Sequence, residues 1–262
     1  MIRYVAAPVL AACAFAQADL KVPADLKFEV ASLKPAAPDQ RGGGVRPSPG
    51  GERYIGQNVT LKTLMMVAYR IRVEQITGGP DWLNNDRFDM NAKAEKAAGA
   101  EELHAMLVNL LIERFDLKFH RDKKEMPMYA LTVASGGPKL TAHQADNPGQ
   151  IWIDARTEGM LHVKMHATFC PMDYFAFQLG TRLDRPVVDL TELKGGYDFD
   201  FFYTRQLPPD IPEGALVNGS PLDTSGPTVF QALKQQLGLE LKAQKGPVDV
   251  IVIDKASKLT EN

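Results

Sequence analysis

Two long stretches of the chain run through the same order of apolar and polar patterns. Each stretch opens with apolar and polar residues in alternation, over residues 54–60 and again over 162–168, which is typical of a half-buried strand. A threonine then stands where a helix would begin, Thr60 in the first stretch and Thr168 in the second, and its hydroxyl could accept an unpaired backbone N–H. We therefore expect a strand that leads directly into a capped helix in both stretches.

The two expected helices carry matching apolar stripes. Their apolar residues recur every three to four positions, which places them on one face of a helix. The matched positions are Leu61, Leu64, Val67, Ala68 and Ile71 in the first helix and Phe169, Met172, Phe175, Ala176 and Leu179 in the second. Each helix is followed by a strand in which an aspartate stands between an aromatic and an apolar residue, at Asp89 and at Asp198.

A second helix and further strands follow in each stretch. The apolar helix faces lie within residues 103–111 and 229–237, and alternating residues come directly after them. The polar run Lys118–Lys124 then predicts a hairpin tip, and a proline precedes a returning strand at 128–133. The second stretch ends in the same way, with a returning strand at 248–253. Each stretch is therefore expected to form strand-helix-hairpin units with two main helices.

These patterns predict an α+β fold in two similar halves that arose by internal duplication, with mixed or antiparallel sheets covered by helices. We place the first half at residues 54–140 and the second at 141–262. Residues 17–53 precede them as an N-terminal strand and a mobile loop rich in glycine and proline. Residues 204–227 are expected to form a proline-rich loop without regular structure.

Residues 1–16 have the pattern of a secretory signal peptide. An uncharged apolar run follows Arg3, and a small-x-small cleavage pattern ends at Ala16. The segment 10–13 also fits a bacterial lipobox, in which Cys13 is lipidated and becomes the mature N-terminus. The apolar run continues past Cys13, which favours ordinary cleavage. We therefore expect a periplasmic or secreted protein, with a lipid anchor at Cys13 as the open alternative.

Charge and cysteine content narrow the class of protein further. The formal net charge is −2, which leaves no basic excess for nucleic acid. No later segment approaches the roughly 18 uninterrupted apolar residues of a membrane span. Once Cys13 is removed, Cys170 is the remaining cysteine, and the mature chain cannot form an intramolecular disulfide. Stability is therefore expected to come from buried apolar side chains.

One spacing suggests a metal site. His162, His166 and Cys170 would align on a continuous helix, but Thr168 and Pro171 indicate that a helix starts between them. A second ligand cluster that would complete a zinc site is absent from the sequence. We interpret the histidines as half-exposed strand residues and Cys170 as a small apolar filler.

Other catalytic signatures fail as well. Asp223–Gly226 looks like the active-site loop of aspartic proteases, but Ser225 stands where that loop has glycine. We interpret this segment as a turn before the helix that begins after Thr228. Motifs for a serine nucleophile, a zinc peptidase and a phosphate-binding loop are absent from the sequence. The sequence therefore designates no catalytic residue, and we expect neither a metal nor another cofactor.

Four residues remain as candidates for a binding site: Asp81, Trp82, Asp89 and Asp198. Trp82 follows Asp81 in a turn-rich connector, where a tryptophan could anchor a partner or fold back onto its own domain. Strand-end aspartates could work as a pair in glycoside hydrolysis. However, Asp89 and Asp198 occupy equivalent places in the proposed repeat, which favours a shared structural role such as a turn or a cap.

Nine short motifs together resemble one bacterial family. They are Phe-Glu-Val-Ala-Ser-Leu-Lys-Pro at 28–35, Asn-Val-Thr-Leu at 58–61, Gly-Gly-Pro-Asp-Trp-Leu at 78–83, Arg-Phe-Asp at 87–89, Glu-Arg-Phe at 113–115, Gly-Gly-Pro-Lys-Leu at 136–140, Arg-Pro-Val-Val-Asp at 185–189, Gly-Tyr-Asp-Phe at 196–199 and Val-Ile-Asp at 252–254. In combination they look like the secreted soil-bacterium-associated family, a domain of unknown function found in large paralogous sets. The resemblance implies bacterial export. It implies no known reaction and transfers no catalytic residue.

Residues 233–241 have a second, more generic resemblance, to the short N-terminal domain of secretins and TonB-dependent receptors. That domain is a small protein-binding module. We therefore hypothesise a non-catalytic binding or sensing module outside the cytoplasm, whose partner is an envelope or extracellular protein or polymer. The competing hypothesis is an extracytoplasmic hydrolase that acts on cell-wall or extracellular polymers through strand-end aspartates.

Overall fold

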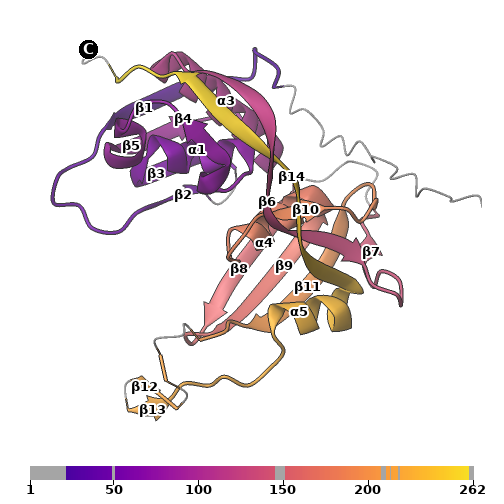
Figure 1. Ribbon diagram of the computed structural model, residues 1–262. Coiled ribbons are helices and arrows are strands. Elements are labelled where there is room, and N and C mark those ends of the chain that lie inside the picture. The colour runs from indigo at the N-terminus through magenta and orange to yellow at the C-terminus, as the bar shows by residue number, and fades with distance from the viewer. Residues whose placement is uncertain are drawn as a thin grey trace, which may run out of the picture.

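The computed structural model describes residues 22–48, 51–144, 151–207, 211–212, 214–217 and 219–259. The expected signal segment and Cys13 lie outside the described residues. Strands hold 41% of the chain and helices hold 23%, which confirms the predicted α+β class. The elements form two lobes that are joined by one long two-stranded ribbon (Figure 1).

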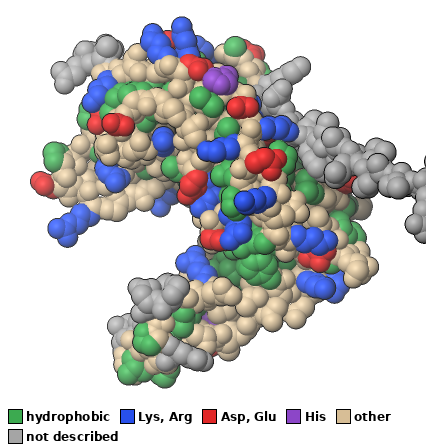
Figure 2. All heavy atoms as spheres, viewed as in Figure 1, with side chains coloured by type: hydrophobic (Ala, Val, Ile, Leu, Met, Phe, Trp, Pro, Cys, Tyr) green, Lys and Arg blue, Asp and Glu red, His purple; other side chains and the backbone are tan. Residues whose placement is uncertain are grey.

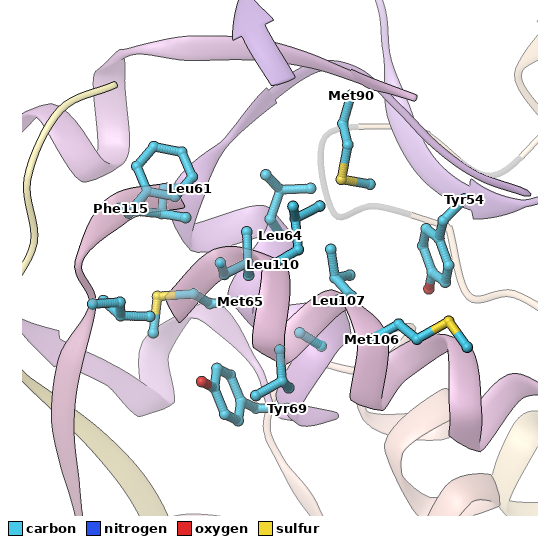
Figure 3. Close-up of a cluster of buried hydrophobic side chains, with 14 of the residues drawn as sticks. Tyr54, Leu61, Leu64, Met65, Tyr69, Met90, Met106, Leu107, Leu110 and Phe115 are labelled. Atoms are coloured by element: carbon cyan, nitrogen blue, oxygen red, sulfur yellow. The ribbon is translucent and has the colours of Figure 1, made fainter. Parts of the chain in front are cut away.

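The first lobe, coloured indigo to magenta in Figure 1, packs helices against a four-stranded antiparallel sheet. Its strands, in spatial order, are β1 (Val30–Pro35), β5 (Arg87–Lys93), β3 (Arg53–Thr60) and β2 (Gly44–Pro47). Its helices are α1 (Leu61–Tyr69), the 3-10 turn η1 (Val73–Gln75), α2 (Trp82–Asn85) and α3 (Ala100–Phe115). The apolar faces of α1 and α3 meet in a core where Leu64, Leu107 and Phe115 are fully buried (Figure 3).

The second lobe, whose strands β8 and β9 are coloured salmon and whose helix α5 is coloured yellow-orange in Figure 1, has the same kind of construction. Its four-stranded sheet runs β7 (Thr141–Ala142), β11 (Tyr197–Thr204), β9 (His162–Cys170) and β8 (Trp152–Glu158). Its helices are α4 (Met172–Gly180) and α5 (Val229–Ala232), which continues as the π-helical turn η2 (Leu233–Leu237). Phe175 of α4 packs edge-on against Phe199 and Phe201 of β11 in the centre of this core.

The ribbon consists of β6 (Lys118–Val133) and β14 (Leu239–Lys255), which pair antiparallel along their length. Each strand begins in the lobe of its own half and ends in the other lobe. Leu131, near the end of β6, packs in the second core, whereas Ile251 and Ile253, near the end of β14, pack in the first core. The two halves therefore exchange the ends of their last strands.

Two short strands extend the ribbon into a four-stranded sheet. β10 (Val187–Asp189) pairs parallel with β6, and β4 (Ile76–Gly78) pairs parallel with β14. Both edge strands therefore also pair with a strand of the opposite half. The sheet is mixed and the lobe sheets are antiparallel, as the apolar patterns predicted.

The predicted hairpin in each half is wrong. The polar run Lys118–Lys124 is not a hairpin tip but the first part of β6, which continues straight to Val133, and β14 is likewise continuous. Alternation is the same in a hairpin arm and in a long strand, so the sequence pattern does not distinguish them. Met126 pairs with Gly246 near the middle of the ribbon, and Pro127 and Pro247 each follow one residue later on opposite strands.

These prolines suggested returning strands because a proline cannot donate a hydrogen bond to a neighbouring strand. β10 and β4 pair with residues 129–131 and 251–253, so they leave the middle of the ribbon two-stranded. In a two-stranded ribbon, every second backbone N–H points away from the partner strand. A proline at such a position lacks an N–H that would have formed no hydrogen bond between the strands. A continuous ribbon therefore tolerates both prolines.

The predicted helix cap is right in one half and wrong in the other. The Thr60 hydroxyl accepts the backbone N–H of Thr63 at 3.2 Å and caps α1. Thr168 is a strand residue instead, and α4 begins one turn later at Met172, with Pro171 in the cap position. A shift of one turn keeps the apolar stripe in phase, which explains why the sequence comparison matched Leu61 with Phe169 instead of Met172.

The segment predicted as an irregular loop contains a small hairpin, β12 (Leu216–Val217) and β13 (Ser220–Pro221), which projects from the second lobe (Figure 1). Figure 2 shows an open notch between this hairpin and the first lobe, with apolar side chains on the adjoining surface of the second lobe. Acidic and basic side chains are intermingled over both lobes on that face. Among the described residues, no helix combines the length and the apolar character that a membrane span requires.

Candidate functional site

Asp89 and Asp198 each hold a backbone amide in a β-bulge. Asp89 Oδ1 accepts the N–H of Asn58 at 2.9 Å, and Asp198 Oδ1 accepts the N–H of Phe169 at 2.8 Å. Both amides belong to residues in the left-handed region, with φ of 49° at Asn58 and 47° at Phe169. The strand register shifts at both places, just before α1 and α4. The two aspartates thus fix the same turn from strand to helix in the two lobes.

The surroundings of the two carboxylates differ. Asp198 also receives Nδ1 of His143 at 2.8 Å. Desolvation acts to raise the pKa of Asp198, but the Phe169 amide and the His143 imidazole outweigh it, so the pKa lies below its usual range. Asp89 and Asp198 lie in different sheets of different lobes, and the structure does not bring them together.

Trp82 folds back onto its own lobe. Its ring stacks on Phe115 with centroids 6.0 Å apart, and Lys258 Nζ lies 5.9 Å from the ring centre. Gly79 has a φ of 72°, and a Cβ there would approach Leu83 Cδ1 to 2.5 Å, so the turn before Trp82 requires glycine. Asp81 is exposed and makes no side-chain cap on α2.

The histidines that suggested a metal site are paired with aspartates. His166 Nδ1 lies 2.9 Å from Asp200 Oδ1, and His162 Nε2 lies 3.0 Å from Asp223 Oδ2. Cys170 is buried, and desolvation raises the pKa of its thiol. Across the part of the chain that the structure describes, no three His, Cys, Asp or Glu side chains converge as metal ligands.

Asp223 belongs to a latch that closes the 204–227 segment onto the sheet of the second lobe. Nδ1 of His162 lies 3.1 Å from the Thr204 hydroxyl, which donates to the Ser225 carbonyl at 2.6 Å. Hydrogen bonds from the side chain and the backbone of Ser225, and from His162, lower the pKa of Asp223 to about 2. Thr204 is 6% exposed, so this Asp-His-Thr arrangement encloses its hydroxyl and functions as an anchor.

Two arginines, Arg70 and Arg72, line the crevice where the lobes meet. Arg70, Ile71, Arg72 and Gln75 line a small crevice together with one face of α4, residues 186–188 and Val248. Asp173, Phe177 and Gly180 form the α4 face. Residues of both halves therefore build this crevice.

Arg70 is the central residue of the junction. Its side chain is 7% exposed, and its guanidinium lies 4.9 Å from the ring centre of Tyr174 in the other half. Nε donates to His104 Nδ1 at 3.3 Å, and Nη1 lies 3.4 Å from Glu101 Oε1. Nη2 is buried and meets no hydrogen-bond acceptor among the described residues.

The neighbours of Arg70 stay neutral at ordinary pH. Burial lowers the pKa of His104 to about 3, and the nearby Arg70 charge adds to that effect. Burial raises the pKa of Tyr54, whose ring lies 6.0 Å from that of His104. Glu101, 60% exposed, is thus the carboxylate paired with Arg70. A buried cation with one long, exposed ion pair is weakly compensated.

Arg72 clamps the other end of the same crevice. Its Nη1 donates to the carbonyls of Gly180 and Leu183, at the C-terminal end of α4, while Nε donates to Glu74 at 3.0 Å. A cation suits this position because carbonyls at a helix C-terminus lack partners within the helix. Arg70 and Arg72 therefore dock α4 of the second lobe onto the first.

Sequence reasoning missed this crevice. Arg70 follows the end of α1 without any motif, and its partners His104 and Tyr174 are distant in sequence. The signal that could have drawn attention to it is the helix end itself. A helix commonly ends at a glycine in the left-handed conformation. Arg70 occupies that position with φ 55° and ψ 44°, so an arginine stands where glycine would be expected.

The chain is thus a two-lobed α+β protein with exchanged strands and a charged junction. The model of DUF3738, described as a protein of unknown function, matches residues 62–256, and the chain belongs to this family. No curated protein and no solved structure matches the chain. The match confirms that the chain carries a domain of unknown function, whereas the secreted and soil-bacterium parts of the resemblance stay predictions.

Proposed function

We propose that this protein is an exported, non-catalytic binding module whose ligand site is the crevice between the lobes. The observation that carries the proposal is the junction itself, where residues of both halves line one crevice and the buried cation Arg70 is among them. Ligand sites favour domain junctions, where a few polar groups converge on an apolar wall. Export, to the periplasm or beyond the cell, rests on the signal pattern of residues 1–16 and on the family resemblance.

Internal duplication is part of the same proposal. The element order β3-α1-β4-β5-α3-β6 in the first half corresponds to β9-α4-β10-β11-α5-β14 in the second. The paired bulges at Asn58 and Phe169 and the paired prolines of the ribbon support it. Two copies that exchange strands would create a junction that neither copy has alone.

The competing hydrolase hypothesis requires two carboxylates close together on one cleft. Asp89 and Asp198 lie in separate sheets, and each one binds a backbone amide. Replacing both by asparagine separates the two hypotheses. We expect a loss of stability and no change in any polymer hydrolysis; a folded double variant that loses a measured hydrolysis would support the enzyme.

Two measurements test the proposal. The mass of the protein recovered from the periplasm of a bacterial host should show an N-terminus at Gln17, or at a lipidated Cys13; an intact Met1 in the cytoplasm contradicts export. Hydrogen–deuterium exchange should then be recorded with and without concentrated cell-envelope extract. We expect protection at 70–75, 173–180 and 186–188. Protection confined to other surfaces would contradict the junction as the binding site.

A further inference from the structure

We propose that the outward face of the first-lobe sheet binds a polyuronate, a linear polysaccharide that carries one carboxylate on each sugar. The sheet of β1, β5, β3 and β2 (Figure 1) turns its other face to α1 and α3, where Tyr54, Phe88 and Met90 are buried in the core. Side chains of a strand alternate between the two faces, so the residues between these buried positions point away from the helices. This site is separate from the crevice between the lobes, and it does not depend on the proposed function.

Cations occupy every strand of this outward face. They are Lys34 on β1, Arg87 and Lys93 on β5, Arg53 on β3 and Arg46 on β2. Lys93 is the direct partner of Arg53 in the register of the sheet, and Arg46 is the direct partner of Ile55. Directly paired residues lie on the same face. Neighbouring strands are about 4.8 Å apart, so the cations are distributed over roughly 14 Å across the four strands.

Two of these cations bind neutral oxygens. Arg53 Nη1 donates to Asn91 Oδ1 at 3.1 Å, and Arg87 Nη1 donates to the Asn58 carbonyl at 2.9 Å. Both arginines are exposed. Because neither oxygen carries a net charge, each guanidinium keeps its positive charge and further N–H donors for a ligand.

The other three cations have one anionic partner between them. Lys93 pairs with Glu29 at 3.1 Å. Lys34 and Arg46 are exposed, and within the described part of the chain their side chains form no ion pair and no hydrogen bond. The strand carboxylate on this face, Asp89, already accepts a backbone amide. The face therefore has an excess of positive charge that the protein does not neutralise.

The matching outward face of the second lobe has the opposite character. Each of its strand carboxylates contacts a cation or a histidine: Asp154 contacts Arg156, Glu158 contacts Lys164, Asp198 contacts His143 and Asp200 contacts His166. A sheet face that points to solvent therefore need not be basic, and the charge of the first lobe is a specific feature. The comparison also disfavours a second copy of the chain as the partner, because the carboxylates of the acidic face are already engaged.

The neutral residues between the cations favour a polysaccharide over a nucleic acid. Ser32 and Asn91 are exposed on this face, and their hydroxyl and amide groups can exchange hydrogen bonds with sugar hydroxyls. The described strand residues of the face include no aromatic ring on which an unpaired base could stack. Guanidinium and ammonium groups bind carboxylates through charge-assisted hydrogen bonds. A sugar chain with a carboxylate on each residue satisfies both the cations and the polar groups between them.

Titration with hexagalacturonate, followed by calorimetry and by amide NMR spectra, tests the inference. We expect shifts at Ser32, Ile55 and Asn91. Hexagalacturonate should bind about tenfold more tightly than the galacturonate monomer or neutral maltohexaose, because several carboxylates bind at once. Added salt should weaken this binding, since exposed charges are screened. Equal binding of maltohexaose, or shifts confined to other surfaces, would overturn the inference.

Two single variants locate the site. Lys34→Gln and Arg46→Gln each remove an exposed cation whose side chain supports no contact in the folded protein, so both should fold. Each should weaken hexagalacturonate binding severalfold, and the double variant should weaken it about tenfold. Arg156→Gln is the matched control, because it removes one cation from the outward face of the second lobe; it should leave binding unchanged. Equal losses in all the variants would show that attraction to the protein is general and would overturn the inference.

Two further measurements distinguish other partners. A single-stranded thymidine hexanucleotide should bind more weakly than hexagalacturonate; tighter binding would assign the face to a nucleic acid. Sedimentation of the protein alone should give the same particle size for the wild type and for Arg46→Gln. Self-association that Arg46→Gln abolishes would assign the face to a second copy of the chain. Either of these results would overturn the inference.

Discussion

The bulges that precede α1 and α4 solve one geometric problem with different side chains. Both place a non-glycine residue in the left-handed region and bind its amide to an aspartate on the neighbouring strand. In the first lobe the residue is Asn58, whose side chain donates to the carbonyls of Gln40 and Gly42 at 2.9 and 2.8 Å. In the second lobe it is Phe169, whose ring packs 5.3 Å from that of His143.

The difference shows which part of the device the backbone requires and which part is adaptable. The aspartate is the same in both lobes because it satisfies an amide that the bulge removes from the ladder. Asparagine adopts the left-handed conformation at a lower cost than phenylalanine does. The second lobe therefore requires more support, which comes from His143 and from the close contact of Phe169 with Gly196.

The largest effect is expected at that contact. A Cβ on Gly196 would lie 2.4 Å from Phe169 Cδ2 and 2.9 Å from the Phe169 backbone carbon. Gly196→Ala should therefore destabilise the protein by about 2–3 kcal/mol, as forced overpacking does. Urea unfolding measures it. The comparison variant is Gly56→Ala in the first bulge, where the nearest side-chain atoms lie 3.3 Å away; they must shift by only a few tenths of an ångström, so a smaller loss is expected. Equal losses would show that the two bulges are equally constrained.

Asn58 provides the next largest effect. Asn58→Ala removes two hydrogen bonds to the 40–42 loop and leaves a Cβ residue in the left-handed region, which together should cost about 2 kcal/mol. Asn58→Gly removes the same hydrogen bonds without that backbone penalty, so it should cost about 1 kcal/mol. Unfolding free energies of the two variants give the backbone share by difference. A glycine variant no better than the alanine variant would contradict the strain at this residue.

Replacing the two aspartates separates their shared role from their different surroundings. At neutral pH, Asp89→Ala and Asp198→Ala should each cost about 1–2 kcal/mol through the lost amide bond. The pKa of Asp198 is lower in the folded protein than in the unfolded chain, so its contribution is full above the unfolded pKa of about 3.9. It is lost as the pH falls through the folded pKa. Unfolding curves of Asp198→Ala and the wild type should therefore converge in acid; a constant difference would contradict the depressed pKa.

The smallest effect concerns the latch of the second lobe. Because the folded pKa of Asp223 is about 2, its contribution is present above about pH 4 and disappears as the pH falls toward 2. Pepsin digestion of residues 205–227 should accelerate over that range in the wild type. At pH 4, Asp223→Ala should be cleaved faster than the wild type. Between pH 4 and pH 2 its cleavage rate should change less than that of the wild type, because it has no Asp223 carboxylate to lose. Parallel pH profiles for both proteins would show that Asp223 does not hold the segment.

Local patterns predicted the fold class, the strand-to-helix step that opens each half, the Thr60 cap and a shared structural role for Asp89 and Asp198. The strand exchange was not predictable in this way, because Lys118–Lys124 alternates equally well in a hairpin and in β6. The junction was missed for a related reason. Arg70 has no periodic or motif signal, and its role depends on Tyr174, which only the folded chain brings near.

The export prediction lies in residues outside the described part of the chain, so it stays a prediction. The structure does not bring the four candidate binding residues together in one site. Trp82 packs on Phe115, Asp81 is exposed, and the two bulge aspartates lie in separate lobes. Their use in binding remains a prediction of the sequence.

The crossed strands have a consequence for a chain that is cut by a protease. If the chain is cut once between residues 144 and 151, the amino-terminal piece still carries β6 and the carboxyl-terminal piece still carries β14, and the two remain woven together along the ribbon. The amino-terminal piece also keeps β4, which pairs with β14, and the carboxyl-terminal piece keeps β10, which pairs with β6. A nicked molecule would therefore migrate as one particle until denaturant separated the two pieces.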